Sequence, residues 1–191
     1  MKYGFIQSQY DERDFKDLGV DNIKLPDYYE VPFNYRVIDQ GNQGSCVSCS
    51  VTEAYFFYRK SIGQDIDIPY DYCYNKRKDK SVEGMTVKEA FDILGSEGRL
   101  DVYSRVSSLD SLKRSILANG PAIIATIVRS DSTEFWNGSQ NLGGHAVAVI
   151  GFDENSIIIK NSWGVSYGNG GFARMRNEDF SKVLECWTIL S

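Results

Sequence analysis

The sequence changes character at Gly120-Pro121, and this change limits the folds that the chain can adopt. Before it, apolar residues recur at helical spacing in three segments that end near glycines, 50–60, 87–94 and 108–119, and a shorter helix is possible near 69–76. After it, β-branched runs bounded by Gly, Asn or Asp predict strands at 122–128, 145–152, 156–161, 171–176 and 185–189. This segregation predicts an α+β fold with a helical half, an antiparallel sheet or barrel half, and a ligand-binding seam between them.

Composition and charge narrow the class of protein. The chain has 191 residues, 42% of them hydrophobic, and a formal net charge of -5. This length suits a single domain, and the acidic balance argues against nucleic acid or anionic lipid as a partner. No stretch approaches the roughly 18 to 20 consecutive apolar residues that a membrane span needs. We therefore expect a monomer that binds neither membranes nor nucleic acid.

The polar first 24 residues have no clean periodicity, so we treat 1–24 as an extension and 25–191 as the domain. Acidic residues interrupt the N-terminus before a secretory hydrophobic region can develop, which favours a cytoplasmic location. The extension has two candidate roles: a strap along the surface of the domain, or a short self-inhibitory segment laid across the seam.

Four cysteines and one histidine restrict the possible chemistry: Cys46, Cys49, Cys73, Cys186 and His145. Four cysteines are too sparse for a disulfide scaffold, so reduced thiols are expected. The Cys-x-x-Cys pair could form a redox site or half of a zinc site, but a second such pair is missing and only one histidine is available. We expect no metal and no organic cofactor.

Cys49 is placed for nucleophilic chemistry. It lies at the start of a predicted helix, where the helix dipole lowers a thiol pKa. His145 opens an apolar strand and can act as its base, and Asn161 ends the next strand, where it can orient the imidazole. Gln43 lies six residues before Cys49, so its amide and the Cys49 N–H can stabilise an oxyanion. These four residues predict an acyl-transfer site.

Three segments resemble the active-site blocks of the papain-like cysteine peptidases: Asn42-Gln-Gly-Ser-Cys-Val-Ser-Cys49, Gly144-His-Ala-Val-Ala-Val-Ile-Gly-Phe152 and Lys160-Asn-Ser-Trp-Gly-Val-Ser-Tyr-Gly-Asn-Gly-Gly-Phe172. The resemblance covers about 25–191. It implies a two-lobe fold, with a helical lobe at about 40–104, a β-barrel-like antiparallel lobe at about 105–191, and a cleft between them. It also implies a cysteine endopeptidase that hydrolyses polypeptides through a thioester acyl-enzyme.

The resemblance assigns a role to each site residue. It implies that Cys49 is the nucleophile, His145 the general base and later acid, Asn161 the residue that orients the imidazole, and Gln43 the oxyanion donor. It further implies that Trp163 shields the Asn-His contact and lines the cleft. Two glycines, Gly84 and Gly144, would hold the substrate main chain.

Departures from the family pattern leave two alternatives open. Ser50, Val51 and Val47 replace the residues that usually surround the nucleophile, and His145 follows Cys49 by 96 residues against the roughly 130–150 usual in the family. A cysteine partner for Cys46 near position 81 is absent, so the family disulfide is not expected. The alternatives are a papain-fold protein that binds peptides with little turnover, and a thiol-dependent amidase or transpeptidase.

Overall fold

The computed structural model describes residues 3–16, 18–32, 36–128 and 141–190. The α-helices are α1 (Cys46–Ser61), α2 (Tyr72–Lys76), α3 (Val87–Ser96) and α4 (Leu109–Asn119), with short 3-10 helices at Glu12–Asp14 and Asn177–Lys182. The strands are β1 (Tyr29–Glu30), β2 (Val102–Arg105), β3 (Ala122–Val128), β4 (Gly143–Phe152), β5 (Ser156–Lys160), β6 (Phe172–Arg176) and β7 (Val183–Leu190). None of these helices combines the length and apolarity needed to span a bilayer.

One antiparallel sheet organises the described residues. Its strands follow the order β2-β7-β3-β4-β5-β6, and β1 pairs with β4 beside this path. The α+β class is therefore confirmed. The barrel-like lobe expected from the family is instead an open sheet over these residues, because the edge strands β2 and β6 do not pair with each other.

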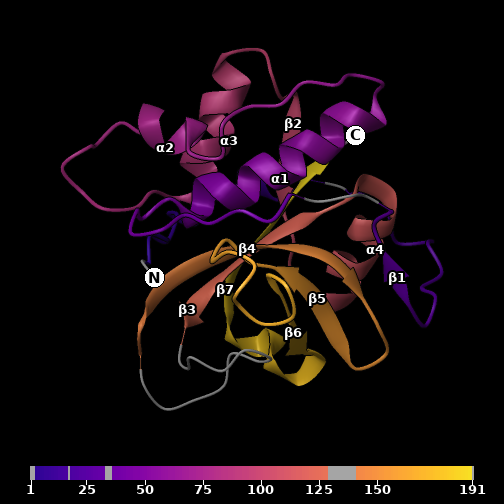
Figure 1. The fold of residues 1–191 in the computed structure, drawn as a ribbon. Coiled ribbons are helices and arrows are strands. Elements are labelled where there is room, and N and C mark those ends of the chain that lie inside the picture. The colour runs from indigo at the N-terminus through magenta and orange to yellow at the C-terminus, as the bar shows by residue number, and fades with distance from the viewer. Residues whose placement is uncertain (1–2, 17, 33–35, 129–140, 191) are drawn as a thin grey trace.

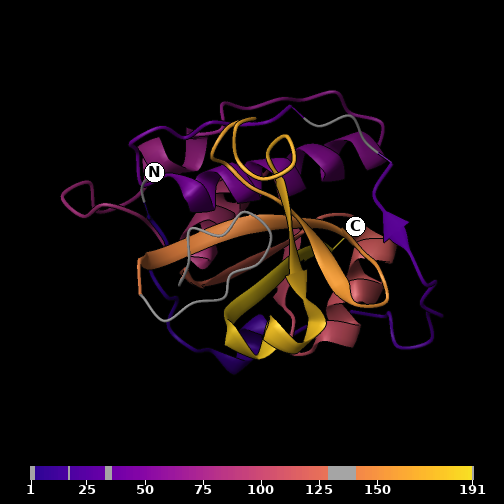
Figure 2. The same ribbon diagram turned by 60° about the horizontal axis from the view of Figure 1, so that its bottom comes forward.

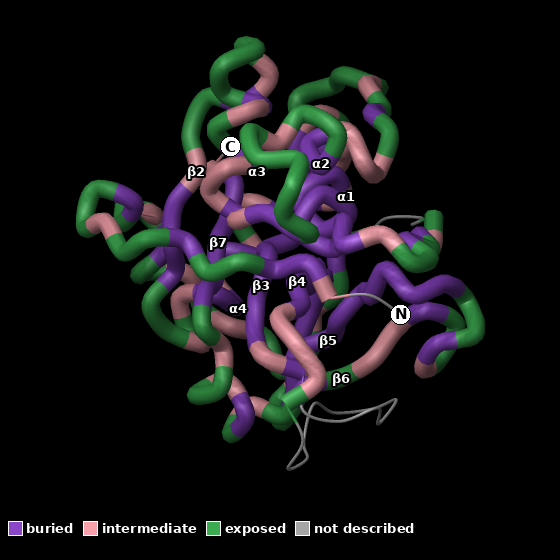
Figure 3. The backbone as a smooth tube through the Cα atoms, turned by 90° about the vertical axis from the view of Figure 1, so that its left-hand side faces the viewer, coloured by how far each residue is buried: buried purple, intermediate pink, exposed green. Residues whose placement is uncertain are grey.

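Helices cover both faces of the sheet (Figure 1). On one face, α1, α2 and α3 pack with Trp187, Ile123 and Ala125 of the sheet. On the other face, α4 packs through Leu112 and Ile116 against the alternate side chains of the strands. Each fully buried side chain of this size contributes about 1.5–3 kcal/mol of transfer free energy. The buried residues concentrate in α1 and in the central strands, as Figure 3 shows.

The local sequence signals explain most element boundaries. Thr86 caps α3, because its hydroxyl accepts a hydrogen bond from the Glu89 N–H at 2.9 Å, while the Glu89 carboxylate accepts one from the Lys78 N–H at 2.7 Å. Ser108 caps α4, which ends at Gly120 in a positive-φ conformation (φ 87°). The first long helix starts earlier than predicted, at Cys46, so Cys49 lies within its first turn.

The first described residues lie against the domain rather than apart from it. Residues 3–9, called the strap below, run from the start of α1 along the seam between the helices and the sheet (Figure 2). Phe5 forms a parallel bridge with Met85, just before α3, and its N–H donates to the Gly144 carbonyl of β4 at 3.0 Å. The strap therefore touches both walls of the seam.

Candidate active site

Cys49 is buried in the first turn of α1, with 1% of its surface exposed. Its Sγ lies 3.9 Å from the Ser45 Oγ, and it also interacts with the Ser162 hydroxyl. Its N–H donates to the Ser45 carbonyl at 2.9 Å. The neighbouring Cys46 thiol interacts with the backbone of Ala146, so the first turn of α1 packs directly beside His145.

His145 and Asn161 meet as the strand prediction requires. His145 lies near the start of β4, and Asn161 follows β5, its antiparallel neighbour. The His145 Nε2 and the Asn161 Oδ1 are 2.8 Å apart, and the same oxygen accepts the Ser162 N–H at 2.7 Å. The Trp163 ring stacks on the imidazole, with ring centroids 4.4 Å apart and an interplanar angle of 23°. The imidazole is thereby fixed in orientation and shielded from water.

Residues 39–45, called the nucleophile loop below, lead into α1 and form hydrogen bonds with the segment that carries Asn161. The Gln40 N–H donates to the Ser162 carbonyl at 2.9 Å, and the Gln40 Oε1 accepts from the Ser162 hydroxyl at 2.5 Å. The Gln40 amide nitrogen donates to the Gln43 carbonyl at 2.7 Å. Gln43, the predicted oxyanion donor, is half-buried on this loop. Gln40 was not predicted as a site residue, because a glutamine in a polar loop carries no distinguishing signal in the sequence.

Burial sets the charge state of the two reacting groups in this conformation. It raises the pKa of the Cys49 thiol far above its ordinary value, and it lowers the pKa of His145 to about 4 although the Asn161 hydrogen bond opposes this shift. Both groups are therefore neutral near pH 7. The lowered thiol pKa expected from the helix dipole does not describe this conformation, since desolvation outweighs the dipole here.

Glycines border the seam beside Cys49 and leave space for a peptide main chain. A Cβ at Gly44 would lie 3.2 Å from the Gly84 nitrogen, and a Cβ at Gly84, which has φ 102°, would lie 2.4 Å from the Gly4 carbonyl oxygen. A Cβ at Gly144 would lie 2.5 Å from the Phe5 carbonyl oxygen. Because these positions lack side chains, an extended backbone approaches both walls closely.

Main-chain groups on these walls bind the strap. The Gly144 carbonyl, a predicted substrate contact, accepts the Phe5 N–H. On the opposite wall the hydrogen-bonding residue is Met85, the neighbour of the predicted Gly84: its N–H donates to the Gly4 carbonyl at 2.9 Å, and its carbonyl accepts the Ile6 N–H at 3.1 Å.

A buried ion pair lies beneath the site. Glu53 stands one helical turn after Cys49 on α1, and its carboxylate contacts the Lys160 ammonium at the end of β5. The Lys160 Nζ also donates to the Arg36 carbonyl at 2.7 Å. Burial raises the pKa of Glu53 and lowers the pKa of Lys160, while the attraction between the two opposes both shifts. This pair was not predicted from the sequence, because its members are 107 residues apart.

The remaining sequence departures have simple structural roles. The Ser50 hydroxyl donates to the Cys46 carbonyl at 2.9 Å, one turn earlier in α1, so it faces the helix backbone. All four cysteines are free and buried. Among the described residues, no group of three or more His, Cys, Asp and Glu side chains is arranged to hold a metal ion.

Comparison with known proteins agrees with this geometry. The family model described as "Papain family cysteine protease" matches residues 37–186, and the chain belongs to this family. Fruit bromelain of Ananas comosus is 28% identical over 117 residues, which are 50% of this chain and 33% of bromelain. Macrodontain-1 of Ananas macrodontes is 27% identical over 150 residues, 74% of this chain and 66% of macrodontain. The chain thus spans only about a third of the length of fruit bromelain.

The fold has close structural neighbours. Xylellain, a cysteine protease from Xylella fastidiosa, superimposes with a TM-score of 0.83 at 20% sequence identity, covering 99% of this chain and 96% of the xylellain chain. A procathepsin B from Trypanosoma congolense superimposes with a TM-score of 0.82 at 13% identity, covering 98% of this chain and 85% of its own. The papain-like fold is therefore confirmed over nearly the whole chain.

Proposed function

We propose that this chain is a cysteine endopeptidase that hydrolyses polypeptides with Cys49, His145 and Asn161. The observation that carries the proposal is the 2.8 Å contact between the His145 Nε2 and the Asn161 Oδ1, beside the first turn of α1, where the Cys49 thiol interacts with the Ser162 hydroxyl. Glycine-lined walls that bind an extended main chain support a peptide as the substrate.

The proposed reaction begins with proton transfer. Asn161 engages the Nε2 of His145, which leaves Nδ1 to take the Cys49 proton. The thiolate attacks the scissile carbonyl, and the Gln43 amide stabilises the resulting oxyanion. His145 then protonates the departing amine, which leaves a thioester on Cys49. A water molecule, deprotonated by His145, hydrolyses the thioester and restores the thiol.

Peptide hydrolysis by site variants tests this proposal. We expect Cys49→Ala and His145→Ala to abolish cleavage of a denatured protein substrate, and Asn161→Ala to lower kcat more than it raises KM. Cys73→Ala is the matched control, because Cys73 is equally buried but lies in α2, where its thiol donates to the Ala90 carbonyl of α3. Retained cleavage by Cys49→Ala contradicts the proposal.

Product analysis separates the two alternatives. A protein that binds peptides without turnover would give peptide binding by the wild type and by every variant, and cleavage by none. A thiol-dependent transpeptidase yields a ligated peptide in place of two fragments. The four free thiols are consistent with a reducing compartment, and we propose a cytoplasmic location on that basis.

A further inference from the structure

We propose that Cys46 and Cys49 form a reversible disulfide in the presence of peroxide, which holds the thiol of the site in an inactive but recoverable state. This inference rests on the proposed function, because Cys49 is the proposed nucleophile, and it concerns redox regulation of the same site. The two cysteines, called the dithiol below, lie in the first turn of α1, and both are free and buried.

The spacing of the dithiol suits a disulfide. Residues three apart in an α-helix lie on the same face, with Cα atoms about 5 Å apart. This separation falls inside the range that disulfides accept, about 4.4–6.8 Å. Disulfide oxidoreductases use Cys-x-x-Cys pairs of this spacing. Ser45, the N-cap residue of α1, makes no capping hydrogen bond with its side chain, so the first turn can adjust without losing one.

Both thiols border the proposed catalytic residues. The Cys46 thiol interacts with the backbone of Ala146, the neighbour of His145. The Cys49 thiol interacts with the Ser162 hydroxyl and electrostatically with Cys46. A bond between the two sulfur atoms therefore removes the nucleophile from the reaction with the imidazole.

The other two cysteines lie in different elements. Cys73 of α2 packs beside α1, where its N–H donates to the Ser48 hydroxyl at 3.1 Å, but its thiol donates to the Ala90 carbonyl at 3.6 Å. Cys186 of β7 belongs to the core cluster on the opposite face of the sheet. Each thiol of the dithiol thus has the other as its partner within one helical turn.

The ionisation of the two thiols favours Cys46 as the first to react. Burial raises the pKa of the Cys46 thiol to about 11, and the backbone groups of Ala146 and Gly4 oppose this shift. Burial raises the pKa of the Cys49 thiol further, and the charges of Cys46 and Glu53 add to the rise. Cys46 therefore ionises more readily, and the thiolate is the form that peroxide oxidises.

The reaction balances with hydrogen peroxide as the only co-reactant. The first sulfur takes one oxygen and becomes a sulfenic acid, while the O–O bond breaks and water leaves. The second thiol attacks the sulfenic sulfur, the S–S bond forms, and the hydroxyl leaves with the thiol proton as a second water. The products are the same whichever thiol reacts first. A thiol such as glutathione reopens the pair through a mixed disulfide.

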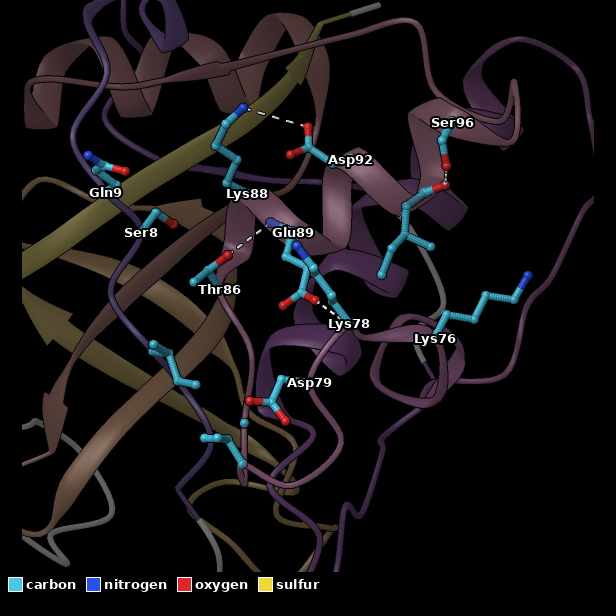
Figure 4. A pocket seen from close by; sticks show the side chains of 14 residues that line it. Ser8, Gln9, Lys76, Lys78, Asp79, Thr86, Lys88, Glu89, Asp92 and Ser96 are labelled. Carbon is cyan, nitrogen blue, oxygen red and sulfur yellow. Dashed lines mark hydrogen bonds and ion pairs between the residues drawn. The ribbon is translucent and has the colours of Figure 1, made fainter.

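Solvent comes close to the dithiol on the side of the strap. Figure 4 shows Ser8 and Gln9 beside a hollow of about 610 Å³ that also reaches Gly84. A Cβ at Gly44, two residues before Cys46, would lie 3.2 Å from the Gly84 nitrogen, so the hollow ends near the start of α1. Local opening of the strap therefore admits peroxide, a molecule little larger than water.

Peptide mapping of the oxidised protein tests the inference directly. Trypsin releases residues 37–59 as one peptide, which contains Cys46 and Cys49 and no other cysteine. After hydrogen peroxide and then iodoacetamide, we expect this peptide to have lost two hydrogen atoms and to carry no alkyl group. Cys73→Ala is the matched control and should give the same closed peptide, because Cys73 packs beside α1 but lies outside the dithiol.

Recovery of cleavage is the second readout. After peroxide and then dithiothreitol, the wild type should regain a fraction of its own untreated kcat/KM at least about fivefold larger than Cys46→Ser regains, because a single thiol proceeds to sulfinic acid. Near-UV circular dichroism checks that each variant is folded. Equal recovery by the two proteins overturns the inference.

Gly4→Ala keeps the test decisive if the buried wild type reacts slowly. A Cβ at Gly4 would lie 2.0 Å from the Gly44 carbonyl oxygen, so the strap of this variant cannot keep its position and peroxide reaches the dithiol. A closed peptide 37–59 in Gly4→Ala supports the inference. Sulfinic acid on either cysteine without closure overturns it.

The outcomes for the disulfide and for the peptidase are distinct. A closed peptide in a protein that cleaves no substrate supports the disulfide and overturns the peptidase proposal. An active enzyme whose two cysteines are both alkylated after peroxide overturns the disulfide and leaves the peptidase proposal intact. Cleavage lost in Cys46→Ser but kept in Cys49→Ser contradicts the role proposed for Cys49, and Cys49→Ser then replaces Cys46→Ser in the recovery comparison that decides the disulfide.

Discussion

Two segments border the cleft, and they are joined to the domain by different chemistry. The nucleophile loop is joined to the segment after β5 by two hydrogen bonds between Gln40 and Ser162, and a third Gln40 bond, to the Gln43 carbonyl, braces the loop itself. Next to the loop, the Gly164 N–H donates to the Ile38 carbonyl at 2.9 Å. The strap is held by three main-chain bonds and by Ser8 on Glu185, with an exposed outer side.

This difference predicts different opening energies. Opening the nucleophile loop breaks its hydrogen bonds to Ser162 and exposes buried polar groups, so we expect it to occur only with global unfolding. Opening the strap breaks three main-chain hydrogen bonds and the Ser8 contacts but disrupts no helix or strand, so we expect a local event. One border of the cleft, called the fixed wall below, consists of the nucleophile loop and the segment that carries Asn161, and we expect it to stay in place. The other border is the strap, called the cover below, and we expect it to open.

The largest expected effect is a loss of unfolding free energy when the ion pair between Glu53 and Lys160, beneath the fixed wall, is broken. Lys160→Met leaves the Glu53 carboxylate buried without its cation, so we expect the free energy of unfolding to fall by about 3–5 kcal/mol. Urea unfolding measures this. The double variant Glu53→Leu with Lys160→Met should recover most of the loss, because an apolar pair replaces an ionic one. A loss below about 1 kcal/mol in the single variant would show that the pair does not hold the wall.

The pH dependence of stability probes the cover. His145 has a pKa of about 4 in the closed state against its ordinary value of 6.5, so the unfolded chain binds more protons between these values. Stability should therefore fall as the pH drops from about 6.5 to 4, by about 3 kcal/mol from this residue. Urea unfolding of wild type and His145→Asn across this range isolates the contribution. Gly4→Ala should show a smaller fall, because solvent reaches its imidazole, and an equal fall would mean that the strap does not desolvate His145.

Amide hydrogen exchange compares the two borders within one molecule. The Phe5 and Ile6 amides should exchange about 30-fold faster than the Gln40 and Asn161 amides after correction for intrinsic rates, which corresponds to about 2 kcal/mol. All four donate to protein carbonyls at 2.9 to 3.1 Å, so bond length does not explain a difference. Equal protection would mean that strap and nucleophile loop open together, and that the cover is part of the fixed structure.

Two kinds of feature could be predicted from the sequence: element boundaries that local residues define, and contacts between strands that are neighbours along the chain. The β3 boundaries were predicted without error, because Pro121 and the β-branched run that follows define them. The proximity of His145 and Asn161 followed from two consecutive strands and is confirmed by their 2.8 Å contact. The roles assigned to Cys49 and Gln43 remain predictions.

Contacts between distant residues were not predictable. Ser8 and Glu185 are 177 residues apart, and neither has a distinctive neighbourhood in the sequence. Strands β1 and β2 were missed because they are short: β1 has two residues, and β2 (Val-Tyr-Ser-Arg) carries a charge although it is paired with β7. The raised pKa of the Cys49 thiol was not predicted for a related reason. A position at the start of a helix can be predicted from the sequence, whereas burial depends on which distant segment covers the site.

The smallest expected effect is that loss of the Thr86 cap of α3 loosens the strap. Thr86→Ala removes the hydrogen bond to the Glu89 N–H and should cost about 1 kcal/mol of stability. Thr86 follows Met85, whose backbone binds the strap, so the loosened start of α3 should also speed exchange of the Phe5 and Ile6 amides. The measurement compares amide hydrogen exchange at Phe5 and Ile6 in the wild type and in Thr86→Ala, under conditions in which the two proteins have the same free energy of unfolding.

A second cap on the opposite face of the sheet provides the control. Ser108→Ala removes the equivalent bond to the Ser111 N–H at 3.1 Å and should cost a similar free energy. Because α4 packs on the face of the sheet opposite α3, this variant should leave the exchange of the Phe5 amide unchanged relative to global stability. If both variants speed strap exchange equally, the strap responds to overall stability, and the local link between α3 and the cover is wrong.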